Sequence, residues 1–303
     1  MSNANKEKKK IFRRKHAGKP KEEQELQMFW FIATISSVYI ISWFFPGMLF
    51  FTYVGYLFYP RFLEVPNFLS LFTNPLNLLT LILFPIIIIL CYILHLFFAS
   101  LVVRFWWNLT EKKSPSKDGN IPRSVRSKAS KFYHVRSFIV KYPKNAIIKG
   151  IFPWLYNKLF NFIGSVEIGK GTTIEEQVVA DRGIKIGENC YIGPNSSITS
   201  HLVEGIFGNI CYFKATIGDN VTLSADTHIG PGNKIGDNSY IFPWGVTQKF
   251  TTNKGDNYYF GMPIRKIFSR KIKKFLQITD EDLKKAEELT EKNRKKQLQK
   301  QKR

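Results

Sequence analysis

A six-residue repeat between Ile168 and Ile241 constrains the fold of this chain more than any other feature of its sequence. Each unit begins with a small or aliphatic lead residue. The leads are Ile168, Ile174, Ala180, Ile186, Ile192 and Ile198, then Ile217, Leu223, Ile229, Ile235 and Ile241. The residue three positions after a lead is most often Gly, Asn or Asp, which accept the positive φ of a tight turn. A short strand and a turn repeated in this way are typical of a hexapeptide β-helix.

Three such units would close one triangular coil, so the leads of successive coils should stack in columns. We expect one column of Ile168, Ile186, Leu223 and Ile241, a second of Ile174, Ile192 and Ile229, and a third of Ile198, Ile217 and Ile235. The alternative is an ordinary sheet protein with frequent turns. Its strands would not keep a fixed period over so many units.

The repeat is interrupted once. Ile198 and Ile217 are nineteen residues apart, where eighteen would preserve the phase, so residues 201–205 are expected to bulge from the coil. Loops on a rigid scaffold often carry function. The imidazole of His201 could act as a general base toward a hydroxyl or an amine, and Glu204 could orient its ring.

Both histidines of the repeat also have non-catalytic interpretations. His201 stands three residues after a lead, so it could instead be a turn residue with positive φ. His228 directly precedes Ile229 and should point outward from a strand. We interpret His228 as an exposed strand residue, with a catalytic or substrate-binding role as the alternative.

Two apolar runs precede the repeat, at residues 28–59 and 75–103. Each exceeds the roughly 20 residues that a helix needs to cross a bilayer. We expect Pro46-Gly47 to kink the first span, with a separate short helix over residues 48–59 as the alternative. Because no cleavage site of small residues follows a short apolar core, the first run is interpreted as an anchor rather than a removable signal.

The formal charge of +22 is concentrated on both sides of these runs. Residues 6–21 carry nine Lys or Arg against one acidic residue, and residues 111–150 carry eleven against two. The connector at residues 60–74 holds only Arg61 and Glu64. Because positive flanks stay in the cytoplasm, we expect a multi-pass membrane protein with both termini and the β-helix domain cytoplasmic.

The chain therefore divides into five expected segments. They are a basic head (1–27), a two-span transmembrane hairpin (28–107), a basic-aromatic juxtamembrane segment (108–162), the β-helix domain (163–268) and a charged C-terminal helix (269–303). The juxtamembrane segment should lie on anionic membrane lipid, and nucleic-acid binding is the less favoured explanation of its charge. The C-terminal helix should begin near Thr279 and continue through Leu283, Ala286 and Leu289.

The sequence predicts no metal site. Cys91, Cys190 and Cys211 lack metal-ligand spacing and are expected to be buried apolar fillers. A γ-type carbonic anhydrase shares this β-helix but requires three zinc-binding histidines. The repeat contains only His201 and His228, so we set that function aside.

The Gly261-Met262-Pro263-Ile264-Arg265 element resembles the Gly-x-Pro-Ala-Lys-like motif that closes the left-handed β-helix in the hexapeptide-repeat acyltransferase superfamily. More narrowly, residues 162–169, residues 199–204 and the two spans are similar to the terminal membrane domain of ε-poly-lysine-synthetase-type nonribosomal peptide synthetases. The chain departs from those synthetases in lacking carrier and adenylation modules. It also has Ile264 in place of the usual small residue of the closing motif.

The resemblance implies a left-handed β-helix, a homotrimer with active sites between neighbouring subunits, and acyl-CoA or another activated acyl donor as co-substrate. It implies His201 as general base and donor contacts at Gly261, Pro263 and Arg265. We therefore expect a membrane-anchored acyltransferase that moves an acetyl, acyl or aminoacyl group onto a hydroxyl or amine, with no tightly bound cofactor. A non-catalytic β-helix scaffold of a membrane complex is the alternative.

Overall fold

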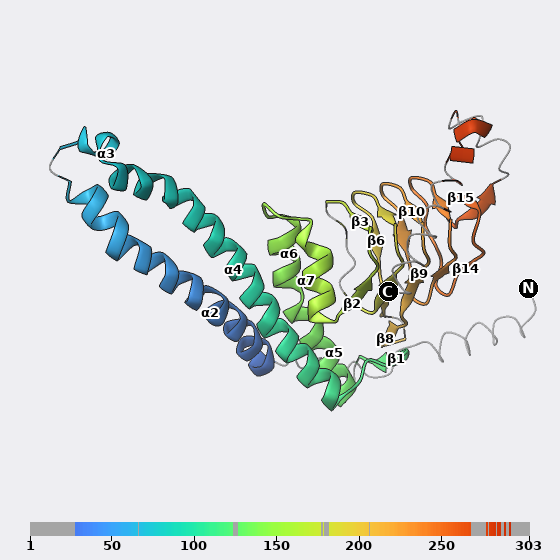
Figure 1. The fold of residues 1–303 in the computed structure, drawn as a ribbon. Coiled ribbons are helices and arrows are strands. Elements are labelled where there is room, and N and C mark those ends of the chain that lie inside the picture. Colours follow the sequence, from blue (N-terminus) through green and yellow to red (C-terminus); the bar gives the residue numbers. More distant parts are fainter. Residues whose placement is uncertain are drawn as a thin grey trace, which may run out of the picture.

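The computed structural model of the chain describes residues 28–65, 67–123, 127–176, 178, 182–205 and 207–267, with 277, 279–282, 284, 285, 288 and 291. The expected basic head lies outside these residues. Figure 1 shows a long helix pair, a group of three shorter helices beside it, and a β-helix whose coils follow one another along one axis.

The helix pair is an antiparallel hairpin. Its first helix, α2 (Met28–Tyr53), contains Pro46 and passes directly into the π-helical segment η1 (Val54–Leu63). Residues 48–59 therefore form no separate short helix. After the single turn α3 (Ser70–Thr73), helix α4 (Pro75–Lys113) returns alongside α2.

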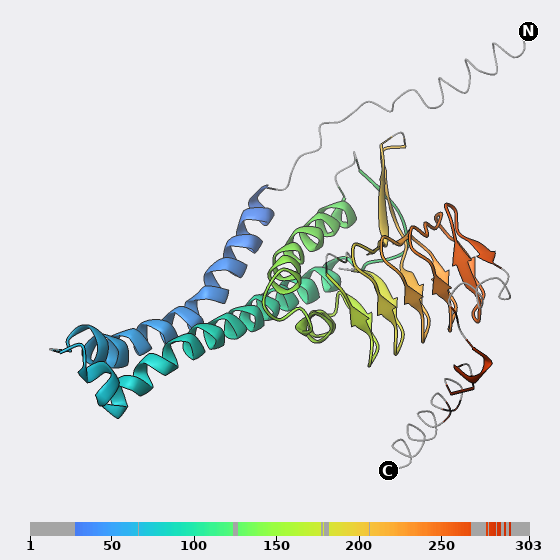
Figure 2. The same ribbon diagram turned by 90° about the horizontal axis from the view of Figure 1, so that it is seen from above.

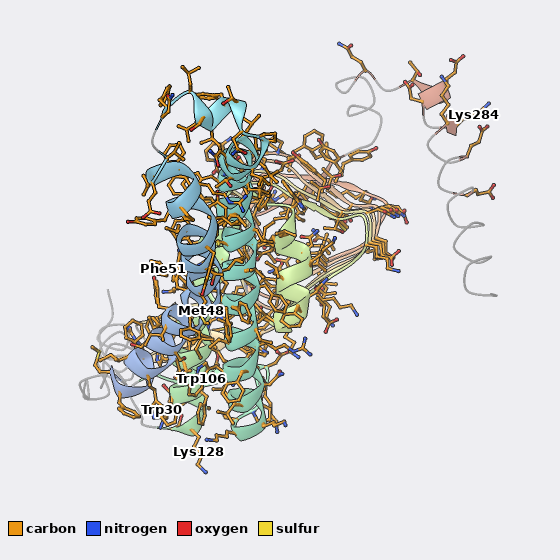
Figure 3. All side chains as sticks on the ribbon, turned by 60° about the vertical axis from the view of Figure 1, so that its left-hand side comes forward. Trp30, Met48, Phe51, Trp106, Lys128 and Lys284 are labelled. Carbon is orange, nitrogen blue, oxygen red and sulfur yellow. The ribbon has the colours of Figure 1, made fainter. Side chains whose placement is uncertain are left out.

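Both long helices are long and apolar enough to cross a membrane. Only 17% of the most apolar 18-residue window of each is buried within the protein. Met48 and Phe51, for example, are 55% and 74% exposed on the outer surface of the hairpin (Figure 3). Apolar patches of this extent on a protein surface mark contact with another apolar partner or with a membrane.

Polar contacts fix how the two helices and their neighbours align. The Tyr53 hydroxyl donates to the Thr80 carbonyl at 2.5 Å, and Trp106 Nε1 donates to Ser37 Oγ at 2.8 Å. Such hydrogen bonds between helices are directional, so they select one alignment of otherwise featureless apolar surfaces.

Three shorter helices join this hairpin to the β-helix: α5 (Lys128–Ile139), α6 (Lys141–Ile148) and α7 (Leu155–Ile163). The Tyr92 hydroxyl of α4 donates to the Ala146 carbonyl of α6 at 2.6 Å. Arg104 Nη1 donates to the Phe162 carbonyl of α7 at 2.7 Å. One continuous cluster of buried apolar residues runs from α2 and α4 through these helices into the coils.

The β-helix has three faces of parallel strands. The first holds β2 (Val166–Ile168), β4 (Ile184–Ile186), β9 (Ala215–Ile217), β12 (Lys234–Ile235) and β14 (Thr252–Asn253). The second holds β3 (Thr173–Ile174), β5 (Tyr191–Ile192), β10 (Thr222–Leu223), β13 (Tyr240–Ile241) and β15 (Tyr258–Phe260). The third holds β6 (Ser197–Ile198) and β11 (His228–Ile229), followed by a bridge from His228 to Val246.

The inner columns differ from those predicted once the chain passes Ile198. The observed columns are Ile168, Ile186, Ile217 and Ile235; Ile174, Ile192, Leu223 and Ile241; and Ile198 with Ile229. The predicted placements of Ile217, Leu223, Ile229, Ile235 and Ile241 were wrong. Ile198 and Ile217 are one unit apart rather than three, because most of the intervening residues leave the coil altogether.

The departing residues form a β-hairpin rather than a bulge. Its strands are β7 (His201–Glu204) and β8 (Asn209–Tyr212), and β8 also pairs antiparallel with β1 (Gly119–Pro122) from the segment after α4. Figure 2 shows the yellow hairpin projecting from the stack of coils beside β1. A segment close to the helix pair thus holds the hairpin in place.

The turn prediction is confirmed at the described positions where φ is positive. These are Gly171, Gly183, Asn189, Asn195, Asn220, Asp226, Gly232, Asn238 and Trp244, and the same six-residue spacing continues at Phe250 and Asp256. The coils therefore extend past Ile241 to Tyr259, which pairs in parallel with Ile241. The last strand, β16 (Arg265–Ile267), then pairs antiparallel with β15.

Helix α7 covers the first coil. The side-chain amide of Asn161 both donates to the carbonyl and accepts from the N–H of Ile168, each at 2.8 Å. Asn157 Nδ2 donates to the Thr172 carbonyl at 2.6 Å. These amides take the place of a preceding strand, so backbone groups at the edge of β2 are satisfied.

At the C-terminal tail, the expected cap is present. The Asp282 N–H donates to Thr279 Oγ1 at 3.2 Å, and the Thr279 N–H donates to Asp282 Oδ2 at 3.0 Å, which is a reciprocal capping arrangement. The predicted positions Leu283, Ala286 and Leu289 lie outside the described residues.

The hairpin register leads to a test by deletion. Removing residues 201–213 restores a six-residue spacing between Ile198 and Ile217, so we expect the shortened chain to keep its coils and melt cooperatively. Removing residues 201–212 leaves a spacing of seven and turns the next strands inside out, because a slip of one residue moves every side chain to the other face. Circular dichroism and thermal melting of both deletions would show the difference. Equal stability of the two would contradict this register.

Gly150, between α6 and α7, allows a second test. A Cβ there would collide with the Tyr92 hydroxyl and the Ala146 carbonyl. We therefore expect Gly150→Ala to destabilise the detergent-solubilised protein by about 1–3 kcal/mol. Gly47→Ala is the matched control, because nothing lies within 4 Å of a Cβ at that position of α2. An unchanged melting temperature for Gly150→Ala would refute the contact.

Candidate functional site

His201 lies at the start of β7, directly opposite Tyr212 of β8, which in turn lies opposite Gly119 of β1. Opposite residues of an antiparallel pair point to the same face. His201 is therefore a strand residue, and it is not among the residues with positive φ, which rules out its interpretation as a turn residue. The hairpin presents the half-buried imidazole beside the coil rather than within it.

The His201 ring is surrounded by polar and aromatic groups. Its Nδ1 lies 3.4 Å from Thr199 Oγ1, and the Thr199 hydroxyl also donates to the His201 carbonyl at 2.9 Å. The ring meets the buried Tyr133 of α5 edge to face, with centroids 6.0 Å apart. The proposed base thus contacts both the β-helix and a helix of the segment that follows α4.

Sequence reasoning missed Arg182, a buried cation that contacts Tyr133, the same tyrosine that meets the His201 ring. Arg182 is 5% exposed, and its guanidinium donates to the Tyr133 hydroxyl at 2.8 Å, hydrogen-bonds Ser137 and lies 4.4 Å above the Tyr133 ring. Its carbonyl accepts from Ser200 at 2.8 Å, one residue before His201. Arg182 is the only arginine between Ile168 and Ile241. That isolation was the one feature of the sequence that could have drawn attention to it.

Glu204 does not lie where a carboxylate that orients the His201 ring would have to be. Residues three apart on a strand point to opposite faces, and the Glu204 carboxylate forms an ion pair with Lys249. This hydrogen bond raises the pKa of Lys249 above its usual value. The contact ties the end of β7 to the coil that carries Lys249, so Glu204 holds the hairpin rather than the imidazole ring.

His228 points outward from the third face, as predicted. Its Nδ1 lies 2.7 Å from Ser197 Oγ of the neighbouring strand β6. The same face continues through Val246, whose N–H bonds the Gly261 carbonyl and whose carbonyl accepts from Ile264. The third face therefore runs from Ser197, next to the His201 hairpin, through His228 and Val246 to the turn that contains Gly261 and Pro263. The hairpin and this turn lie at opposite ends of the face.

Arg265 is exposed on β16, where it pairs with Phe260. Neighbouring parallel strands are about 4.8 Å apart, and about three such spacings separate β6, the strand before His201, from the Gly261 turn on the third face. The His201 hairpin and the Gly261 turn are therefore about 14 Å apart along the third face. Arg265 lies beside this turn, at the end of the second face.

The protonation states around the hairpin follow from burial. Burial, then the charges of Arg182 and Arg123, lower the pKa of His134 from its ordinary 6.5. Burial also raises the pKa of the Tyr212 hydroxyl and of the Cys190 and Cys211 thiols. All three cysteines are buried and unpaired, as predicted, and the two thiols in the β-helix domain are poor nucleophiles because burial keeps them protonated.

A cavity of about 370 Å³ adjoins Tyr212 between α4 and the first coils. Its lining includes Trp107, Ser165 and Lys214. Ser165 Oγ is buried there without a hydrogen-bond partner. Within the described ranges, no cluster of three or more His, Cys, Asp or Glu side chains could hold a metal ion.

Comparison with known proteins agrees with the fold. Residues 165–200 match the family described as bacterial transferase hexapeptide (six repeats). The chain is 29% identical over 155 residues to a Bacillus subtilis protein named "Putative acetyltransferase YvoF", covering 48% of this chain and 88% of that one. It is 33% identical over 97 residues to the galactoside O-acetyltransferase of Escherichia coli, covering 30% and 48% respectively.

Among solved structures, the chain is similar to a hexapeptide-repeat-containing acetyltransferase of Vibrio cholerae in complex with acetyl coenzyme A. The identity is 25% and the TM-score 0.32, over 36% of this chain and 62% of that one. The chain thus spans most of the length of YvoF, about half of the galactoside enzyme and less than two thirds of the Vibrio structure. The repeat, its stacked coils and these matches together show that the β-helix of this chain is similar to hexapeptide-repeat transferases.

Proposed function

We propose that the protein is a membrane-anchored acyltransferase that moves an acetyl, acyl or aminoacyl group from acyl-CoA, or another activated donor, to a hydroxyl or amine. The observation that carries this proposal is the His201 hairpin. The coils do not need it, yet β1, Tyr133 and the Glu204–Lys249 pair all hold it. The acetyltransferase names of the relatives support the same reaction class.

His201 acts as the general base. Because Nδ1 faces the Thr199 hydroxyl, we assign proton acceptance to Nε2. As the acceptor oxygen or nitrogen attacks the donor carbonyl, Nε2 takes its proton. The tetrahedral intermediate then collapses, the bond from carbon to the leaving group breaks, and the proton passes to that group. Backbone N–H groups of the Gly-rich turns would stabilise the oxyanion.

The donor would lie along the third face, with the Gly261 and Pro263 turn at its far end, Arg265 on the adjoining strand β16, and the reactive carbonyl near His201. Arg265 is exposed there and suits the phosphates of a CoA-like donor. The acceptor group would occupy the cavity beside Tyr212, where Ser165 Oγ can hydrogen-bond to it.

Both long helices would span the membrane, with the termini and the β-helix domain on the cytoplasmic side. Their uncovered apolar surface and the basic segments at residues 6–21 and 111–150 support this arrangement. A homotrimer with sites between neighbouring β-helices, and a relationship to the membrane domain of the peptide synthetases, remain predictions from the resemblance.

A non-catalytic scaffold is the competing function. The Glu204–Lys249 pair favours it, because the carboxylate expected to support the base is engaged elsewhere. Donor binding separates the two functions, since a scaffold would show no saturable protection by CoA thioesters.

The His201 assignment predicts the largest kinetic effect. We expect His201→Ala to lower kcat by about 10²–10⁴-fold in a thiol-release assay with acetyl-CoA, because proton transfer by a positioned base contributes that much. His228→Ala changes the other histidine of the repeat, which lies on the face assigned to the donor, so it should alter KM for the donor but keep most of kcat. Full turnover by His201→Ala would disprove the general base.

Glu204 and Lys249 should act by positioning the hairpin. We expect Glu204→Gln to reduce kcat by roughly tenfold or less, well short of the loss for His201→Ala, because it loosens β7 without removing the base. Lys249→Gln should have the same effect, and the double variant should be no worse than either single change, since both remove one contact. Additive losses would show that the two residues act separately.

A further inference from the structure

A second cavity, of about 510 Å³, lies between the end of α4, strand β1 and the start of α5. Four cationic side chains line it, Lys113, Lys117, Lys128 and Arg136, and among the described lining residues Asp118 is the only carboxylate. Lys128 and Ala129 belong to the first turn of α5, so the positive end of that twelve-residue helix also faces the cavity. The electrostatics of this cavity favour an anion.

The single carboxylate among the lining residues offsets only part of the positive charge. Asp118 Oδ1 accepts from the Lys214 N–H at 3.1 Å, and its one negative charge is matched against three lysines. The three lysines are exposed, and their side chains form no salt bridge within the described part of the chain, so their charge is available to a ligand.

Arg136 gives the cavity a fixed floor. It is 4% exposed, its Nη1 donates to the Ser114 carbonyl at 2.9 Å, and its Nε lies 3.4 Å from a Glu111 carboxylate oxygen. A buried guanidinium held by two partners is preorganised, whereas surface lysines are flexible. Because Arg136 shares its charge with Glu111, it shapes the floor of the cavity, and the three exposed lysines supply the net positive charge.

The cavity lies at the end of the helix pair where a membrane surface is expected. Trp30 and Trp106 meet edge to face at 6.3 Å, and the ammonium groups of Lys131 and Lys113 lie 4.4 Å and 6.0 Å from the Trp30 ring centre. Figure 3 shows Trp30, Trp106 and Lys128 at the same end of the pair, away from Met48 and Phe51. Tryptophans with lysines just beyond them are typical of the lipid headgroup level.

We propose that this cavity binds the phosphate group of an anionic membrane lipid. The inference rests on the membrane anchoring put forward under the proposed function. Tyr212 and Ser116 line both this cavity and the cavity assigned to the acceptor, and Tyr212 lies opposite His201. A lipid held by its phosphate would therefore have its headgroup at the base of the catalytic hairpin.

The test uses the full chain purified in an uncharged detergent and titrated with short-chain phosphatidylglycerol, with phosphatidylcholine of the same chain length, and with inorganic phosphate. We expect phosphatidylglycerol to bind at least about tenfold more tightly than phosphatidylcholine, since each lysine near an anionic headgroup favours it. Competition by inorganic phosphate at low concentration would assign the site to free phosphate. Competition only at high concentration would assign it to lipid.

The triple variant Lys113→Gln, Lys117→Gln, Lys128→Gln should lose at least about tenfold in phosphatidylglycerol affinity. The control triple Lys234→Gln, Lys254→Gln, Lys266→Gln removes the same charge from exposed sites on the β-helix and should bind as the parent does. Equal loss in both triples, or no preference between the two lipids, would overturn the proposal. His201→Ala should still bind the lipid, so a failed transferase assay and a failed headgroup site give different results.

Discussion

The stacking of aliphatic side chains inside the coils is the interaction on which the rest of this molecule depends. Ile186, Ile192, Ile198, Ile217 and Leu223 are each no more than 2% exposed. Each inner residue is covered mainly by the residue one coil above and one coil below, so stability is a sum of neighbour contacts. Because the core tolerates no change of period, additional sequence can only leave at a turn, and the largest such departure carries His201.

That departure connects the two halves of the protein. Strand β1 belongs to the segment after α4, while β7 and β8 belong to the β-helix, and the three form one antiparallel sheet. Tyr133 and Arg182 repeat the connection with side chains. The proposed base is thus positioned jointly by the coils and by the segment nearest the apolar hairpin.

The two apolar runs predicted both long helices, and the repeat predicted the coils and the turn residues, because these features depend on local periodicity and composition. It failed at the interruption: a separation of nineteen between Ile198 and Ile217 fits either a slip of one residue or an excursion of thirteen. Period alone cannot distinguish them, since the partner of β8 lies about 90 residues earlier, at Asn120 and Ile121. Long separations also explain why the Tyr133–Arg182 contact, across 49 residues, was missed, and why Glu204 was assigned to His201 rather than to Lys249, 45 residues away.

The two ends of the β-helix are each covered in part, by different means. Asn157 and Asn161 of α7 occupy the backbone groups of the first coil, while β16 runs against the last coil in the opposite direction. A solenoid with open parallel edges can add further chains end to end and grow into fibres. Here the amide of Asn161 meets the edge of β2 and the antiparallel β16 meets the edge of β15, so these two edges offer no free parallel template to another chain.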